Sequence, residues 1–102
     1  MAIAYNEDAL KLIKRKIQKD GRGIFRKGIP DCKRKTYVEW ITRTYTEDIE
    51  YCQRLINSGS PLVMFTHDHM IKLDHDKIKY LVGFLSRQKY KLINKLTQYN
   101  IQ

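Results

Sequence analysis

The apolar positions over residues 6–19 recur every three or four residues, so that leucine and isoleucine side chains share one side of a helical projection. Most of the lysines and arginines in this segment lie elsewhere on the projection. Asn6 is a candidate N-cap, and Gly21 can take the left-handed position that follows a helix end. The pattern predicts an amphipathic helix over 6–19 that ends before Gly21.

The next segment, residues 21–35, holds three of the five glycines, one proline and six basic side chains. Glycine and proline at this density are typical of irregular structure, so we expect a basic loop over 21–35. Residues 36–46 are ambiguous. Alternating β-branched and aromatic residues favour a strand, whereas the spacing of Val38, Ile41 and Tyr45 favours a helix. We prefer the helix.

A separate helix is predicted over residues 47–57, capped by Thr46 and ended by Gly59. Two short apolar runs follow and are joined by His67, Asp68 and His69, which predicts a β-hairpin over 62–73. A long helical pattern then extends from residue 74 or 75 to about residue 99.

These elements predict a single α+β domain over residues 1–102 that is mostly helical, because a chain of this length holds only one core. The order of helix, loop, helix, helix, short hairpin and long C-terminal helix is that of a winged helix-turn-helix domain. The alternative is a strand at 36–46 in a small antiparallel sheet packed by helices.

The composition indicates a soluble, intracellular protein. No apolar stretch is long enough to span a membrane, and the first residues lack the basic and apolar pattern of a secretory leader. Two cysteines are too few for a disulfide framework. We therefore expect a cytoplasmic location with reduced thiols, and no membrane partner.

Charge changes this picture most. The chain has a net charge of +9, and the excess is segregated: residues 1–35 carry +7, residues 36–76 carry −4 and residues 77–102 carry +6. Two basic ends that meet in the fold would add their fields and attract a polyanion. The expected function is non-enzymatic binding of nucleic acid, RNA or DNA, through its backbone, with a regulatory role. The candidate binding residues are Lys14, Arg15, Arg22, Arg26, Lys27, Lys33, Arg34, Lys35, Arg87, Lys91 and Lys95.

The acidic middle argues against conventional major-groove readout. Glu47, Asp48 and Glu50 would open the recognition helix of a winged helix, where carboxylates repel phosphates. Contacts from the two ends to a duplex backbone or to RNA are expected instead. The main alternative is an inhibitor or adaptor that docks on an acidic protein partner. A homodimer is a further expectation, since the acidic middle complements the basic ends and the last helix could supply an apolar seam.

A third hypothesis is a small ribonuclease that uses His67 or His69. Histidines at i and i+2 of a strand point the same way and could share a metal or act as general acid and base. Histidines in a turn and at a helix start, His75 included, more often serve hairpin and N-cap roles. We therefore predict no enzyme, no catalytic residue, no metal site and no cofactor.

Overall fold

The computed structural model describes residues 2–26 and 28–98. Strand β1 (Ala2–Tyr5) leads into helix α1 (Asn6–Arg26), and a short 3₁₀ helix, η1 (Asp31–Lys33), leads into helix α2 (Arg34–Ser58). Strands β2 (Leu62–Phe65) and β3 (His69–Leu73) follow, and helix α3 (His75–Gln98) is the last described element. The predicted α+β, mostly helical class is confirmed.

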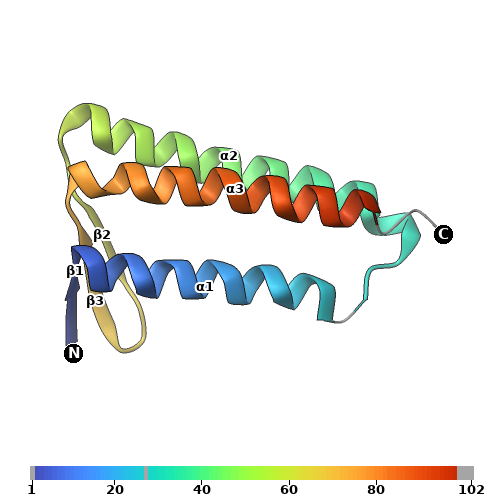
Figure 1. The fold of residues 1–102 in the computed structure, drawn as a ribbon, viewed down its shortest axis with the longest axis horizontal. Coiled ribbons are helices and arrows are strands. Elements are labelled where there is room, and N and C mark those ends of the chain that lie inside the picture. Colours follow the sequence, from blue (N-terminus) through green and yellow to red (C-terminus); the bar gives the residue numbers. More distant parts are fainter. Residues whose placement is uncertain (1, 27, 99–102) are drawn as a thin grey trace.

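The three strands form one mixed sheet at one end of the molecule, with β3 in the centre. β2 pairs antiparallel with β3, as the predicted hairpin requires, and β1 pairs parallel with β3. From this end α1 and α3 run in the same direction, and α2 returns between their far ends and the sheet (Figure 1). The molecule measures 45 × 29 × 16 Å.

Apolar side chains are buried in two clusters along the helices. The first packs the inner face of the sheet against α1 and α3 and includes Ile71, Leu73 and Ile78. The second lies toward the other end and joins Ile41 of α2 to Leu92 and Leu96 of α3. The apolar stripe of α3 is thus covered within the chain, so it is not free to form the dimer seam that the sequence suggested.

The predicted loop over 21–35 is shorter than expected. Helix α1 continues through Gly21 to Arg26, because Gly21 is buried where α1 meets α3 and does not adopt a left-handed conformation. Gly28 does, with φ of 75°, and its N–H donates to the carbonyl oxygen of Phe25 at 3.2 Å. The glycine that follows the helix is therefore Gly28, about two turns later than predicted.

The predicted break at Thr46 is absent. Residues 34–58 form one continuous helix, since no glycine or proline interrupts them. The alternative strand at 36–46 and the helix-turn-helix of a winged domain are therefore both wrong at this point of the chain. The predicted C-terminal end is confirmed: Gly59 has φ of 68°, and the N–H of Ser60 donates to the Leu55 carbonyl at 2.9 Å.

Strand β1 was missed by the sequence reasoning, and so was the link that aligns α1 with α3. Asn6 has φ of 43°, and its side chain bonds to a residue 68 positions away instead of capping α1. The N–H of Asp74 donates to Asn6 Oδ1 at 3.0 Å, and Asn6 Nδ2 donates to Asp74 Oδ2 at 3.1 Å. This pair holds the starts of α1 and α3 at the same level.

Candidate nucleic-acid interface

Helical spacing places a row of cations along α1. Arg15, Arg22 and Arg26 follow one another at intervals of seven and four residues, and all three are exposed. Residues at such intervals lie on the same side of a helix. Between residues 9 and 26 the helix carries seven basic residues and one acidic residue, so this side of α1 is strongly positive.

A second row runs along α3. Arg87, Lys91 and Lys95 recur every four residues and are exposed, as the predicted ridge requires. Residues 77–98 hold six basic residues and no acidic one. A β-carbon built on Gly83 would stand 3.3 Å from Nη1 of Arg87, which places this guanidinium over the preceding turn of its own helix.

The two rows meet because α1 and α3 approach closely at Gly21. A β-carbon there would lie 3.3 Å from Cδ2 of Leu92, so only glycine leaves ordinary van der Waals space at this point. Just beside this contact a hollow of about 280 Å³ opens between the helices, and Arg22 of α1 lines it together with Lys91 and Lys95 of α3. Basic residues from the two ends of the chain thus share one site.

Aromatic rings support the cations of this surface. Lys95 Nζ lies 4.3 Å from the centroid of the Phe25 ring, so a lysine of α3 is held over a ring of α1. Lys14 Nζ lies 5.5 Å from the centroid of Phe84, so here the lysine belongs to α1 and the ring to α3. Gln18 and Gln88 complete the hollow with neutral hydrogen-bonding groups. We name the surface formed by these two rows the α1–α3 face.

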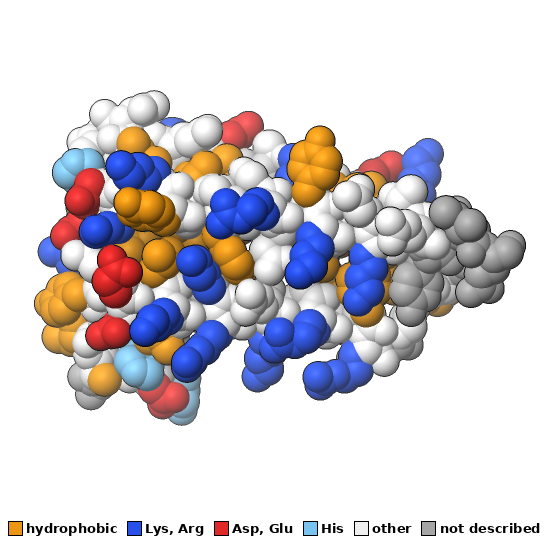
Figure 2. All heavy atoms as spheres, viewed as in Figure 1, with side chains coloured by type: hydrophobic (Ala, Val, Ile, Leu, Met, Phe, Trp, Pro, Cys, Tyr) orange, Lys and Arg blue, Asp and Glu red, His pale blue; other side chains and the backbone are white. Residues whose placement is uncertain are grey.

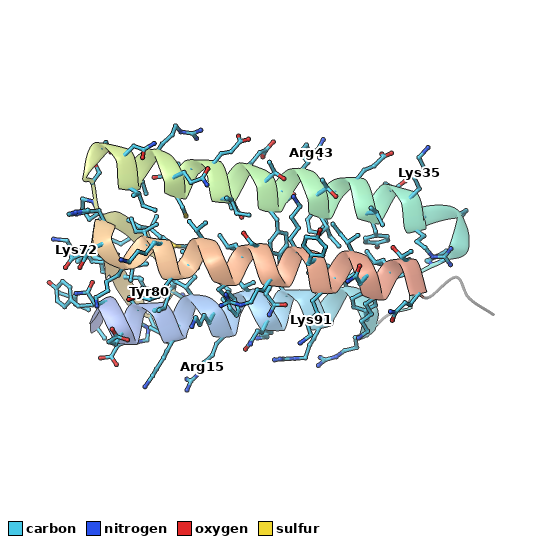
Figure 3. The ribbon with its side chains drawn as sticks, turned by 45° about the horizontal axis from the view of Figure 1, so that its top comes forward. Arg15, Lys35, Arg43, Lys72, Tyr80 and Lys91 are labelled. Atoms are coloured by element: carbon cyan, nitrogen blue, oxygen red, sulfur yellow. The ribbon has the colours of Figure 1, made fainter. Side chains whose placement is uncertain are left out.

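Figure 2 shows the charge distribution on this side of the molecule. Lysine and arginine side chains gather in two rows over α1 and α3, whereas acidic side chains lie at the sheet end and over α2. Figure 3 shows Arg15 and Lys91 on this side, with Lys35 and Arg43 projecting from α2 in the other direction. The acidic residues Glu47 and Glu50 belong to α2 and do not separate the two rows.

The structure divides the predicted set of site residues. Lys14, Arg15, Arg22 and Arg26 lie on α1 and join the ridge of α3, but the cations that follow them in sequence do not. Lys33 and Lys35 are exposed beyond the end of α1, on η1 and the first turn of α2. Arg34 is only 8% exposed, so its side chain is not part of the surface. Lys27 lies outside the described residues.

Sequence reasoning left out three cations of the same face. Lys11 precedes Arg15 by four residues and extends the row of α1, and Lys19 flanks that row. On α3, Lys77 lies nearly three turns before Arg87. The repeat of four between Lys11 and Arg15 was visible in the sequence.

A second hollow of about 510 Å³ lies between α1 and α2, lined mostly by apolar side chains. Asp20 of α1 and Asp48 of α2 line it, and both, after burial, raise the pKa of Tyr45. Burial, and next the neighbouring Glu47, also raises the pKa of Asp48. The carboxylate of Asp20 is 3.8 Å from Lys16 Nζ and therefore belongs to this hollow and not to the α1–α3 face.

The histidines lie at the sheet end. His67 is in the turn between β2 and β3, so the strand alternation that would align it with His69 does not apply. Thr66 Oγ1 accepts a hydrogen bond from the backbone N–H of His69 at 3.0 Å, and this bond closes the turn that holds His67. Within residues 2–26 and 28–98, no three side chains of His, Cys, Asp or Glu come together in a way that could hold a metal ion.

No protein-family model, curated protein or solved structure shows significant similarity to the chain. Among the described helices, none combines the length and the apolar character that crossing a membrane requires. Function must therefore be argued from the surface itself.

Proposed function

We propose that the protein is a non-enzymatic nucleic-acid-binding protein that contacts the phosphate backbone through the α1–α3 face. The observation that carries this proposal is the meeting of cations from opposite ends of the chain, with Arg22, Lys91 and Lys95 lining one hollow. Arginine offers planar bidentate donors to phosphate, and lysine offers a mobile point charge. Neither needs a particular base sequence, so the binding is expected to follow the backbone.

The size of the face suits several phosphates. At 1.5 Å per residue, the row from Lys11 to Arg26 is about 22 Å long, which corresponds to roughly six or seven nucleotides at 3.4 Å each. The ridge of α3 runs beside it at a helix-to-helix distance of about 8–10 Å. The ridge from Arg87 to Lys95 is about 12 Å long. Together the two rows can reach about five phosphates at once, so log affinity should fall by roughly 4.5 for each tenfold rise in salt on duplex DNA.

The unbound face also bears a cost that a polyanion removes. Arg87, Lys91 and Lys95 repel one another at intervals of four residues, and so do Arg22 and Arg26. Each such pair destabilises a helix by about 0.2–0.5 kcal/mol. A phosphate placed between two of these cations replaces repulsion by two attractions, which supports anion binding over a merely solvated surface.

The test is a salt titration of affinity with charge-reversal variants. Fluorescence anisotropy would follow labelled 20-base-pair DNA, the matching RNA duplex and its single strand between 50 and 300 mM KCl. The variant Arg15→Glu/Lys91→Glu alters the α1–α3 face, and Lys35→Glu/Arg43→Glu changes the net charge equally on the other side of the molecule.

At 100 mM salt the loss of two phosphate contacts should weaken binding by about 60-fold and flatten the salt slope by about 1.8. The α2 variant should lose only a few-fold, because charges beyond a Debye length of about 10 Å are screened. Equal losses in the two variants, or no binding by the wild type at low salt, would contradict the proposal. In the second case an acidic protein partner becomes the better explanation. Cleavage of the RNA that His69→Ala abolishes would instead reveal a ribonuclease.

A further inference from the structure

The sheet has an outer face that no part of the described chain covers. The register pairs Ile3 with Met70 and Met70 with Phe65, and it pairs Tyr5 with Lys72 and Lys72 with Val63. Residues paired in this way share a face of the sheet. The alternate residues, such as Ala4, Ile71 and Leu73, are buried on the inner face against the helices.

This outer face is apolar where a solvated sheet would be polar. A sheet that packs helices on one side normally alternates apolar residues inward with polar residues outward. Here five of the six outward residues are apolar, and Lys72 is the exception. Phe65 is 69% exposed, Tyr5 55%, Ile3 54% and Val63 46%. In β1 the small residues point inward and the large ones point outward. The large side chains therefore do not contribute to the core of the monomer.

The exposed apolar area supplies about half of what a stable interface needs. An aromatic side chain presents about 150–250 Å², so Phe65 and Tyr5 together expose roughly 250 Å². Ile3 and Val63 bring the total to about 400 Å², which lies within the range of about 300–600 Å² for the largest apolar patch of an ordinary monomer, a patch that is often functional. A stable interface buries about 800 Å² per partner. The surrounding rim, with Tyr80 53% exposed at the same end, can supply the remainder (Figure 3).

The rim identifies the kind of partner. This end of the molecule carries both signs of charge: Lys72 lies on the outer face itself, Lys77 is in the first turn of α3, and Asp68, Asp74 and Asp76 are their neighbours in the sequence. Lys77 Nζ already lies 3.7 Å from Glu7 Oε1. Carboxylates repel nucleic acid and anionic lipid, whereas a mixed rim is complementary to itself under a twofold rotation.

We infer that the outer face of the sheet is the interface of a homodimer, in which two copies stack their three-stranded sheets face to face at the usual spacing of about 10 Å. The second copy buries Phe65 and Val63 from each side and places the two sets of helices at opposite ends. The dimer does not depend on the proposed nucleic-acid binding, because the apolar residues that carry the interface, Ile3, Tyr5, Val63 and Phe65, are not part of the α1–α3 face.

Sedimentation equilibrium at 1–100 µM protein, in 0.15 and 0.5 M NaCl, tests this inference. The wild type should have twice the chain mass of 12.2 kDa. Phe65→Glu and Val63→Glu should each raise the dissociation constant at least 100-fold. Tyr90→Glu is the matched control, because Tyr90 is 73% exposed on α3, away from the sheet, and should leave the dimer intact.

A wild type that stays monomeric at 100 µM would overturn the dimer, and so would a folded Phe65→Glu or Val63→Glu variant that still dimerises. Circular dichroism establishes which variants are folded. Should neither fold, hydrogen exchange of the wild type at 1 and 100 µM decides. Protection that rises with concentration over residues 2–5 and 62–73 supports the interface, and protection elsewhere refutes it. Measuring duplex binding by the monomeric variants tests the proposed function independently of the dimer, because a variant can lose one property and keep the other.

Discussion

The contact between Gly21 and Leu92 determines whether the two basic rows lie together, and an alanine at Gly21 tests it. In the interior of a helix, alanine is favoured over glycine by about 0.8–1.0 kcal/mol. At Gly21 the added methyl would stand 3.3 Å from Cδ2 and 3.6 Å from Cδ1 of Leu92, a side chain only 7% exposed. Overpacking of a core costs about 1–3 kcal/mol. The gain is therefore cancelled or exceeded, and we expect no stabilisation and up to about 2 kcal/mol of loss.

Gly23 provides the internal control, because it lies in the same helix and no atom lies within 4 Å of a β-carbon built there. Gly23→Ala should realise the full gain of about 1 kcal/mol, which raises Tm by about 4–8 °C in a domain of this size. Thermal and urea unfolding of both variants, followed by circular dichroism, measure the difference. Equal stabilisation by the two alanines would refute the close approach of α1 to α3 and, with it, the geometry of the α1–α3 face.

Two further predictions concern the junction at Asn6 and the cysteines. Asn6→Gly should lose about 1–2 kcal/mol in urea unfolding, because two side-chain hydrogen bonds to Asp74 disappear while glycine accepts the φ of 43°. Asn6→Ala should lose about 1 kcal/mol more from backbone strain, and equal stability of the two variants would contradict a strained position. Native protein should expose one fast thiol to a disulfide reagent, Cys32, whereas Cys52 should react only after unfolding. Burial, and next Asp48, raises the pKa of Cys52, so the folded state keeps the proton and stability should fall as pH rises past about 8.5. Rapid labelling of Cys52 in the Cys32→Ser variant under native conditions would argue against its burial.

Local signals in the sequence determined the helical character, the hairpin and the end of α2. Gly59 and Pro61 end that helix wherever it packs, because the left-handed conformation and the missing N–H are properties of the residues themselves. The ridge of Arg87, Lys91 and Lys95 was equally visible, since the helical period alone places residues four apart on one side. The net charge and its segregation toward the two ends were also readable without coordinates.

Tertiary packing decided the rest. Gly21 fits a helix end as well as a helix interior, and only the buried contact with Leu92 selects the interior. The pairing of β1 with β3 joins residues nearly seventy positions apart, and no local periodicity records such a partner. For the same reason the sequence could assign cations to both ends of the chain but not state which of them meet. The parallel course of α1 and α3, held by Asn6 and Asp74 at one end and Gly21 farther along, places Arg22 beside Lys91 and separates both from Lys35.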